Sequence, residues 1–125
     1  KWNLSASHNA GKVSSAVDGN LGTRFDTATV MVPGMWFQIE LPETTEISGL
    51  RLDSAGSVLD YPSGYEVAVS VDGKSWSPPL VKGKGTHPLT EIYFSGVKAK
   101  LIKIVQTGRR PGKYWSIHDL QIYGK

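Results

Sequence analysis

The sequence predicts an antiparallel β-sandwich or barrel of seven or eight short strands. Apolar and polar residues alternate with a period of two in most segments, and turn residues separate nearly every pair of these segments. No window of helical length carries an apolar stripe at i, i+3, i+4 and i+7. With 125 residues, of which 39% are hydrophobic, the chain is long enough for one domain with one core.

The expected strands can be placed in order along the chain. The first segment, 2–7, and the last, 120–123, can both be strands that close the domain, and 12–18 can form one short helical turn. The odd-numbered residues from 35 to 41, and again from 65 to 71, form apolar faces opposite more polar ones. The remaining strand segments are 46–52, 90–94, 98–107 and a restart at 74–76, with turns at 33–34, 72–73, 83–85 and 109–113.

Composition excludes several classes of function. The formal net charge of +3 is too small for a dedicated nucleic-acid-binding protein. No cysteine is present, so the chain has neither a disulfide framework nor a thiolate metal site. No apolar run is long enough to cross a membrane, and the sequence shows no initiator methionine and no signal peptide. We therefore expect a mature chain, or a module excised from a larger protein.

Basic residues gather between Val97 and Tyr114 without an intervening acid. One interpretation is a strand edge or solvent-facing strand protected by lysines. The other is a surface patch for an anionic ligand. The residues are Lys98, Lys100, Lys103, Arg109, Arg110 and Lys113.

The sequence lacks the usual signatures of a catalytic site. The three histidines do not form HExxH, and no GxSxG, GxGxxG or Walker loop occurs. His118 precedes Asp119, but adjacent residues of a strand point to opposite faces and do not make a dyad. We therefore expect a protein that is not an enzyme.

Eight motifs cover essentially the whole chain. They are SASHNAG, AVDGNLGTRF, PGMWFQIEL, YPSGYEVAVSVDGKSW, GKGT, TEIYF, VKAKLIKIVQTG and YWSIHDLQIYG. In this order they resemble the discoidin family (coagulation factor 5/8 type C domains), and within it the family-32 carbohydrate-binding modules. The resemblance implies a jelly-roll β-sandwich. It also implies a monomeric, non-catalytic module that holds a secreted, bacterial, glycan-degrading enzyme on its glycan, with the catalytic domain in the same parent chain.

The same resemblance implies a structural calcium site in the stretch AVDGNLGTRF. Calcium takes about six to eight oxygen ligands. Two positions depart from the family pattern, since Asp119 replaces a longer glutamate and Phe25 replaces a tryptophan expected in the core. The alternative is a calcium-free turn in which Asp18 accepts backbone N–H groups. The implied ligands are the carbonyl of Ala16 and the side chains of Asp18, Asn20, Thr23 and Asp119.

The resemblance places a sugar site on the loops at one end of the sandwich, here 26–34, 53–63 and 108–115, with 8–12 nearby. Sugars stack on exposed aromatic rings and bond to planar polar groups. The candidate ligands are Asp26, Met31, Trp36, Asp60, Tyr61, Arg109, Arg110, Tyr114 and Trp115.

Several of these candidates also fit a structural role. Trp36 fits the second face of a buried strand, and Tyr61 fits packing beneath its loop. Tyr114 and Trp115 are adjacent, so in an extended segment one of them points inward. We expect Arg24 to form a structural ion pair.

Two other functions remain open from the sequence. The phospholipid-binding branch of the same family presents apolar residues in the loop that matches 26–34, where this chain has Val30, Met31 and Val32. A module of this kind would bind membranes or cell surfaces. A protein-binding or spacer module without a small ligand is the third possibility.

Overall fold

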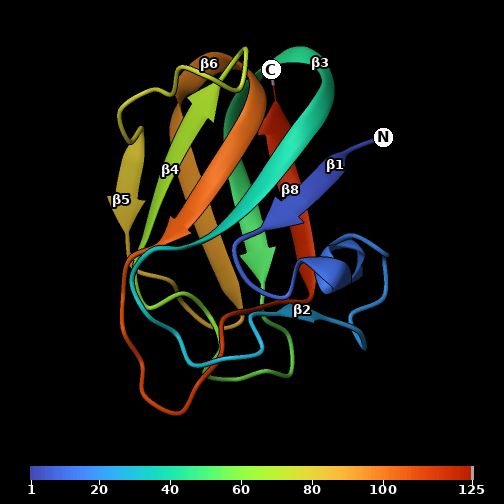
Figure 1. Cartoon of the computed structure of the whole chain (residues 1–125), viewed down its shortest axis with the longest axis vertical. Coiled ribbons are helices and arrows are strands. Elements are labelled where there is room, and N and C mark those ends of the chain that lie inside the picture. The colour runs from blue at the N-terminus through green and yellow to red at the C-terminus, as the bar shows by residue number, and fades with distance from the viewer. Residues whose placement is uncertain (125) are drawn as a thin grey trace.

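The computed structural model describes residues 1–124 and consists almost entirely of antiparallel strands (Figure 1). The predicted β-sandwich is confirmed, and one short 3-10 helix, η1, accompanies the strands. The elements are β1 (Asn3–Ala6), η1 (Ala10–Ala16), β2 (Phe25–Asp26), β3 (Met35–Asp53), β4 (Tyr65–Ser70), β5 (Val81–Gly83), β6 (Leu89–Gln106), β7 (Ser116–Ile117) and β8 (Asp119–Gly124).

The two layers of the sandwich share their two longest strands. β3 and β6 pair with each other along most of their length, with register shifts between Glu40 and Thr45 and between Ile47 and Gly49. Both ribbons curve over at the top of Figure 1, so each strand contributes to both layers. One layer contains β1, the first half of β3, the second half of β6, β4 and β5. The other contains β8, the second half of β3 and the first half of β6.

The alternation seen in the sequence sets the core. Met35, Phe37 and Ile39 of β3 are fully buried, while the residues between them lie on the outer face. Phe25 of β2 is also fully buried and contacts Phe37 edge-to-face, with ring centroids 5.0 Å apart. The expected core role of Phe25 is therefore confirmed.

The strands differ from the sequence prediction in number and in boundaries, and β5 lies where only a turn at 83–85 was expected. Segments 35–41 and 46–52 form one strand, β3, and segments 90–94 and 98–107 form one strand, β6. No strand restarts at 74–76, because Asp72 Oδ1 accepts the N–H groups of Lys74 (2.8 Å) and Ser75 (3.0 Å) and holds a turn. The two-residue strands β2 and β7 were not predicted, since a pair this short has no periodicity to read.

The long loops gather at one end of the sandwich, at the bottom of Figure 1. We call this the loop end: residues 26–34, 54–64, 84–88 and 107–115. The labelled chain ends lie toward the opposite end. Within residues 1–124, no helix has the length and apolar character needed to cross a membrane.

Candidate functional site

Two loops at the loop end are joined like a continuation of the β2–β7 pair. Thr27 and Trp115 are linked in both directions, since the Thr27 N–H donates to the Trp115 carbonyl (3.0 Å) and the Trp115 N–H donates to the Thr27 hydroxyl (3.2 Å). Further along, Met31 and Arg110 form an isolated bridge, and the Met31 N–H donates to the Lys113 carbonyl (2.7 Å). The loops 26–34 and 108–115 therefore hold each other in place.

Gln106, at the end of β6, connects three loops through its buried side-chain amide. Its Oε1 accepts the backbone N–H groups of Gly64 (3.3 Å) and Gly108 (2.9 Å). Its Nε2 donates to the carbonyl oxygens of Val32 (3.1 Å) and Gly108 (2.7 Å). Because the side chain is fully buried, water cannot replace these bonds, and the loops 26–34, 53–63 and 108–115 share one fixed support.

Arg24 lies between two carboxylates at the loop end. Its Nε is 3.0 Å from Asp26 Oδ2, and its Nη1 is 3.5 Å from Asp60 Oδ2 and 2.8 Å from Ser57 Oγ. The Asp60 carboxylate also accepts the Ser116 hydroxyl (2.6 Å). The structural ion pair expected of Arg24 is confirmed, and the same contacts engage Asp26 and Asp60 within the protein.

His118 is buried beneath this network. One ring nitrogen, Nε2, is 2.7 Å from Ser57 Oγ, and the other, Nδ1, is 2.7 Å from the Leu21 carbonyl oxygen. Both nitrogens are thus occupied by contacts that join the loop 16–25 to the loop 53–63. His118 has a structural position, and the expected absence of a dyad with Asp119 agrees with it.

Tyr61 and Arg110 form the aromatic and cationic part of the loop end. The Arg110 guanidinium lies 4.6 Å from the centroid of the Tyr61 ring. Neither Arg109 nor Arg110 forms a salt bridge with another residue in the described part of the chain. Arg109 and Tyr114 are exposed on the same loop as Arg110, so this loop offers guanidinium groups without a carboxylate partner and an exposed aromatic ring.

Met31 and Trp115 do not reach the surface. Both have an exposed fraction of 0%, so the expectation that they are exposed for a ligand is wrong. Met31 is drawn inward by the bridge with Arg110, and its Sδ accepts the Ser63 N–H (3.4 Å). Of the adjacent pair Tyr114 and Trp115, the tryptophan is the residue that points into the core.

Trp36 lies on the outer face of the layer that contains β4, away from the loop tips. It pairs with Val105 of β6 and shares that face with Lys103, whose Nζ is 5.5 Å from the Trp36 ring centroid. Its ring is partly buried, as expected for the second face of a strand. The structure does not bring Trp36 together with Tyr61, Arg109 and Tyr114.

The six basic residues after Val97 separate into groups. Lys98 and Lys100 lie where β6 bends, and Lys100 Nζ is 3.7 Å from Glu40 Oε2. Lys103 lies on the outer face of the sheet beside Trp36. The loop end contains the other three, Arg109, Arg110 and Lys113.

The loop of the expected calcium site is closed by its own oxygen atoms. Asp18 Oδ2 accepts the Thr23 hydroxyl (2.5 Å), and Asp18 Oδ1 accepts the Asn20 N–H (3.0 Å). The Thr23 hydroxyl is also 3.0 Å from the Asn20 carbonyl oxygen. These bonds lower the pKa of Asp18, first through the Thr23 hydroxyl and then through the Asn20 N–H. Ala16, the last residue of η1, is fully buried beside this loop.

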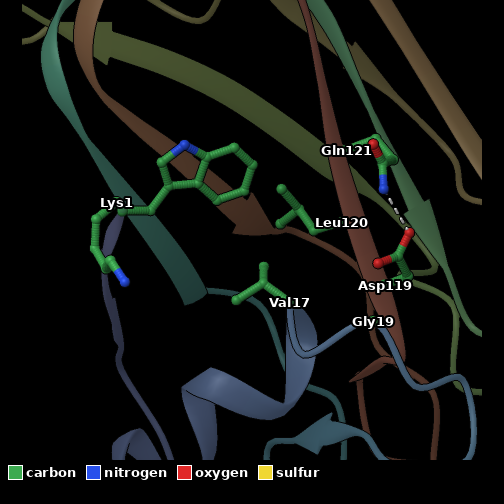
Figure 2. Close-up of a pocket in the computed structure, with 7 residues that line it drawn as sticks. Lys1, Val17, Gly19, Asp119, Leu120 and Gln121 are labelled. Carbon is green, nitrogen blue, oxygen red and sulfur yellow. Dashed lines mark hydrogen bonds between the residues drawn. The ribbon is translucent and has the colours of Figure 1, made fainter.

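Asp119 lies near this loop but bonds elsewhere. Gly19 and Asp119 line the same hollow, which has a volume of about 510 Å³ and is also lined by Lys1, Trp2, Val17, Leu120 and Gln121. Figure 2 shows the Asp119 carboxylate turned toward Gln121, whose Nε2 donates to Asp119 Oδ2 (2.9 Å).

The donor set fits a calcium ion. The Thr23 hydroxyl lies within hydrogen-bond distance of both the Asp18 carboxylate and the Asn20 carbonyl oxygen. Calcium prefers this all-oxygen chemistry. Among residues 1–124 no group of three or more His, Cys, Asp or Glu side chains gathers for a metal, and the expected set contains only two such residues, Asp18 and Asp119.

The residues missed from the sequence are Gln106 and an apolar rim. Leu21, Val58 and Leu59 are exposed at 53%, 56% and 42% beside the Arg24 network. Gln106 lies in β6, where apolar and polar residues alternate, at a position where an apolar core residue was expected. A polar residue at such a position is the one feature of the sequence that could have identified it.

Comparison with known proteins gives consistent matches. The family described as the F5/8 type C domain matches residues 3–120. A curated sialidase of Micromonospora viridifaciens is 28% identical over 92% of this chain, and the chain spans about a fifth of that protein's length (19%). Several of the solved structures that match this chain are carbohydrate-binding modules.

Two of these solved structures come from Clostridium perfringens. A family 32 module of a GH89 protein, in complex with GalNAc-β-1,3-galactose, superposes with a TM-score of 0.82 at 21% identity, covering 98% of this chain and 95% of that one. The family 32 module of NanJ, in complex with galactose, superposes with a TM-score of 0.81 at 22% identity, covering 98% of this chain and 93% of that one. These matches confirm the jelly-roll sandwich.

Proposed function

Since this chain belongs to the F5/8 type C domain family, we propose that it is a non-catalytic module that binds a glycan through its loop end. The observation that carries the proposal is the contact of Tyr61 with the Arg110 guanidinium, from a loop that also exposes Arg109 and Tyr114. An aromatic ring can stack on the C–H face of a sugar, and guanidinium groups can bond to its hydroxyl or acidic groups. The cation held over Tyr61 occupies one ring face, so in this proposal a sugar stacks on the other face of Tyr61 or on the exposed Tyr114.

The rigidity of the loop end also supports binding. A preformed site loses less conformational entropy when it binds its ligand. The amide of Gln106 holds the three loops, and the carboxylates of Asp26 and Asp60 hold Arg24. In this proposal Asp26, Asp60 and Arg24 position the site, while Tyr61, Arg109, Arg110 and Tyr114 contact the sugar.

The biological role we propose is to hold a secreted, bacterial glycan-degrading enzyme on its substrate. The sialidase relative is about five times as long as this chain, which fits a module within a multidomain enzyme. The solved relatives with bound galactose and GalNAc-β-1,3-galactose support a saccharide ligand. A catalytic domain in the same parent chain and an extracellular location are parts of this proposal.

Glycan-array binding followed by affinity gel electrophoresis tests the loop end. We expect Tyr61→Ala and Arg109→Ala to weaken retention on the best glycan by about fivefold or more, since each removes a stacking or charge-assisted contact. Tyr93→Ala is the matched control, because Tyr93 is equally aromatic and 64% exposed but lies on β6, away from the loops. Unchanged retention in both loop variants, with unfolding temperatures equal to that of the wild type, would contradict the site.

A membrane-binding role is the second candidate, favoured by the apolar rim. Val30 is exposed at 41% in the loop 26–34, and Val58 and Leu59 are exposed in the loop 54–64 of the same end. The three-residue apolar tip expected at 30–32 does not form, since Met31 is buried and Val32 packs against the core. Sedimentation with phosphatidylserine vesicles, without any signal on the glycan array, would replace the glycan proposal by this one.

We also propose that the loop 16–25 binds a structural calcium ion. Asp18, Asn20 and Thr23 would hold it, with the Ala16 carbonyl and Asp119 as further ligands. The ion would supply positive charge that fixes these oxygens and ties the loop to β8. Asp119 would have to exchange its bond with the Gln121 amide for the ion.

A further inference from the structure

Two tryptophans and one lysine form a cluster on the side of the sandwich. Lys103 Nζ lies 5.5 Å from the Trp36 ring centroid and 4.5 Å from the Trp76 ring centroid. By these two distances the ring centroids are at most about 10 Å apart. We call Trp36, Trp76 and Lys103 the lateral cluster.

The sheet positions each member of the lateral cluster. Trp36 and Lys103 lie on the outer face, because the neighbours of Lys103 on β6, Ile102 and Ile104, are fully buried on the inner one. Trp76 reaches this face from the segment after β4, which Ser77 ties to Val69 by two hydrogen bonds. Trp36 and Lys103 are therefore held by strands and Trp76 by a segment tied to β4, and none of the three belongs to the loop end.

Lys103 has no ionic partner in the described chain. The two carboxylates on its sheet face are engaged by other lysines, since Glu66 lies 3.7 Å from Lys82 and Glu40 lies 3.7 Å from Lys100. Cation–π contacts with two indoles hold the ammonium group in place while they leave its N–H donors unpaired with acceptors. An anionic group would complete the coordination of this ammonium.

We propose that the lateral cluster is a second binding site, specific for an acidic saccharide. The sugar's carboxylate or sulfate would bond to Lys103, and its C–H face would lie against the partly exposed edges of Trp36 and Trp76. Gln38, which pairs with Lys103 in the sheet, offers a neighbouring amide for a hydroxyl group. This site takes only its class of ligand, a saccharide, from the proposed function. It shares no residue with the loop end.

Charge favours an acidic saccharide over the other occupants of such a face. A neutral sugar could accept hydrogen bonds from the ammonium but would leave its positive charge without a counter-charge. A membrane would require apolar side chains that extend outward, and both indoles here are partly buried against the sheet. With one unpaired cation, the lateral cluster also lacks the run of phosphate contacts that nucleic acids need.

Affinity gel electrophoresis with three polysaccharides tests this site. Polygalacturonate carries carboxylates, dextran sulfate carries sulfates, and galactan is neutral. We expect Lys103→Gln and Trp76→Ala to weaken retardation by polygalacturonate, by dextran sulfate or by both, by about fivefold or more, without an effect on galactan. Lys98→Gln removes the same charge from the same strand at its bend, and we expect it to behave as the wild type.

The loop-end variant Tyr61→Ala separates this site from the proposed function. If Tyr61→Ala abolishes all retardation and Lys103→Gln changes none, the lateral site is overturned and the loop end stands. If Lys103→Gln removes acidic binding and Tyr61→Ala changes nothing, the lateral site stands and the loop end is overturned. Equal weakening by Lys98→Gln, or sedimentation with phosphatidylserine vesicles without retardation by either polyanion, also overturns the lateral site.

Tryptophan emission gives a readout that does not depend on stability. We expect trigalacturonate to shift the emission of the wild type by contact with the indoles. The same addition to Trp76→Phe should give a smaller shift at an unchanged unfolding temperature. An identical shift in both proteins would count against the contact.

Discussion

The side-chain amide of Gln106 contacts the backbone of three loops, so its replacement tests how the loop end is held. Gln106→Leu leaves the N–H groups of Gly64 and Gly108 and the carbonyl of Val32 without partners in a buried region. We expect a loss of about 3 kcal/mol in unfolding free energy and a fall of roughly 10 °C in melting temperature by circular dichroism. Gln121→Leu, at an exposed glutamine of β8, is the control, and equal melting temperatures would refute the role of Gln106.

Acid titration tests the closed loop around Asp18. The pKa of Asp18 is lowered from 3.8, first by the Thr23 hydroxyl, so its carboxylate contributes stability at pH values above 3.8 that is lost as the pH falls through the lowered pKa. Thr23→Val should move the pKa of Asp18 up toward 3.8 in an NMR titration. The pKa of Asp72, which backbone N–H groups lower in a similar turn, should not move. A fixed Asp18 pKa would contradict the assignment.

The environment of an individual residue was predictable where it depends on neighbours in the sequence. Arg24 between acids and Phe25 in the core followed from the sequence. The burial of Met31 did not, because it depends on a bridge to Arg110, which is 79 residues away in the chain. For the pair Tyr114 and Trp115, alternation showed that one points inward but not which one.

At the scale of elements, Gly49 is the position where β3 cannot carry a side chain. A Cβ there would collide with the Ile92 carbonyl oxygen and approach the rings of Tyr93 and Tyr123, which stack across it. We expect Gly49→Ala to lower the unfolding free energy by about 2 kcal/mol, measured by urea denaturation. Gly56→Ala, where a Cβ meets nothing within 4 Å, should be close to neutral, and similar values for both would contradict this explanation.

The strands were predictable from alternation, but their fusion into long strands was not. Pro42 and the polar residues 43–46 interrupt the apolar pattern of β3, so the sequence there resembles a turn. In the structure the chain bends at this point and stays paired with β6 after a register shift. At a bend between two layers the strand keeps its hydrogen bonds, but both of its faces are exposed. The alternation of apolar and polar residues, from which a strand is predicted, is therefore absent there.

At the scale of the whole molecule, chelation tests the proposed calcium. A ligand that binds only the folded state at a hundredfold excess over its Kd adds about 2.7 kcal/mol. EDTA should therefore lower the melting temperature of the calcium-loaded protein by roughly 5–10 °C. Asp18→Asn should abolish this response, and Asp72→Asn, in another exposed turn, should keep it. A wild type whose melting temperature is the same with calcium and with EDTA would refute the site.

The position of a binding surface on the whole molecule was only partly predictable. The order of motifs led us to expect Tyr61, Arg109 and Tyr114 on loops of one end, and the loops that contain them, 54–64 and 107–115, lie at one end of the structure (Figure 1). Trp36 was expected there too, but the register of β3 against β6 puts it beside Lys103 on the side of the sandwich. Register is a long-range property, and a shift of one residue would have turned the ring into the core.

The pairing of β8 has a mechanical consequence. Among the described strands β8 pairs with β3, in continuous register from Gly49 opposite Tyr123 to Asp53 opposite Asp119, and it runs away from the loop end. When the loop end is fixed to a surface and the chain is pulled at Gly124, the force acts along the strand. Because β8 is joined through β7 to residues 107–115 of the loop end, this force passes along a backbone that is already extended, and the rungs between β8 and β3 are not the links that must break.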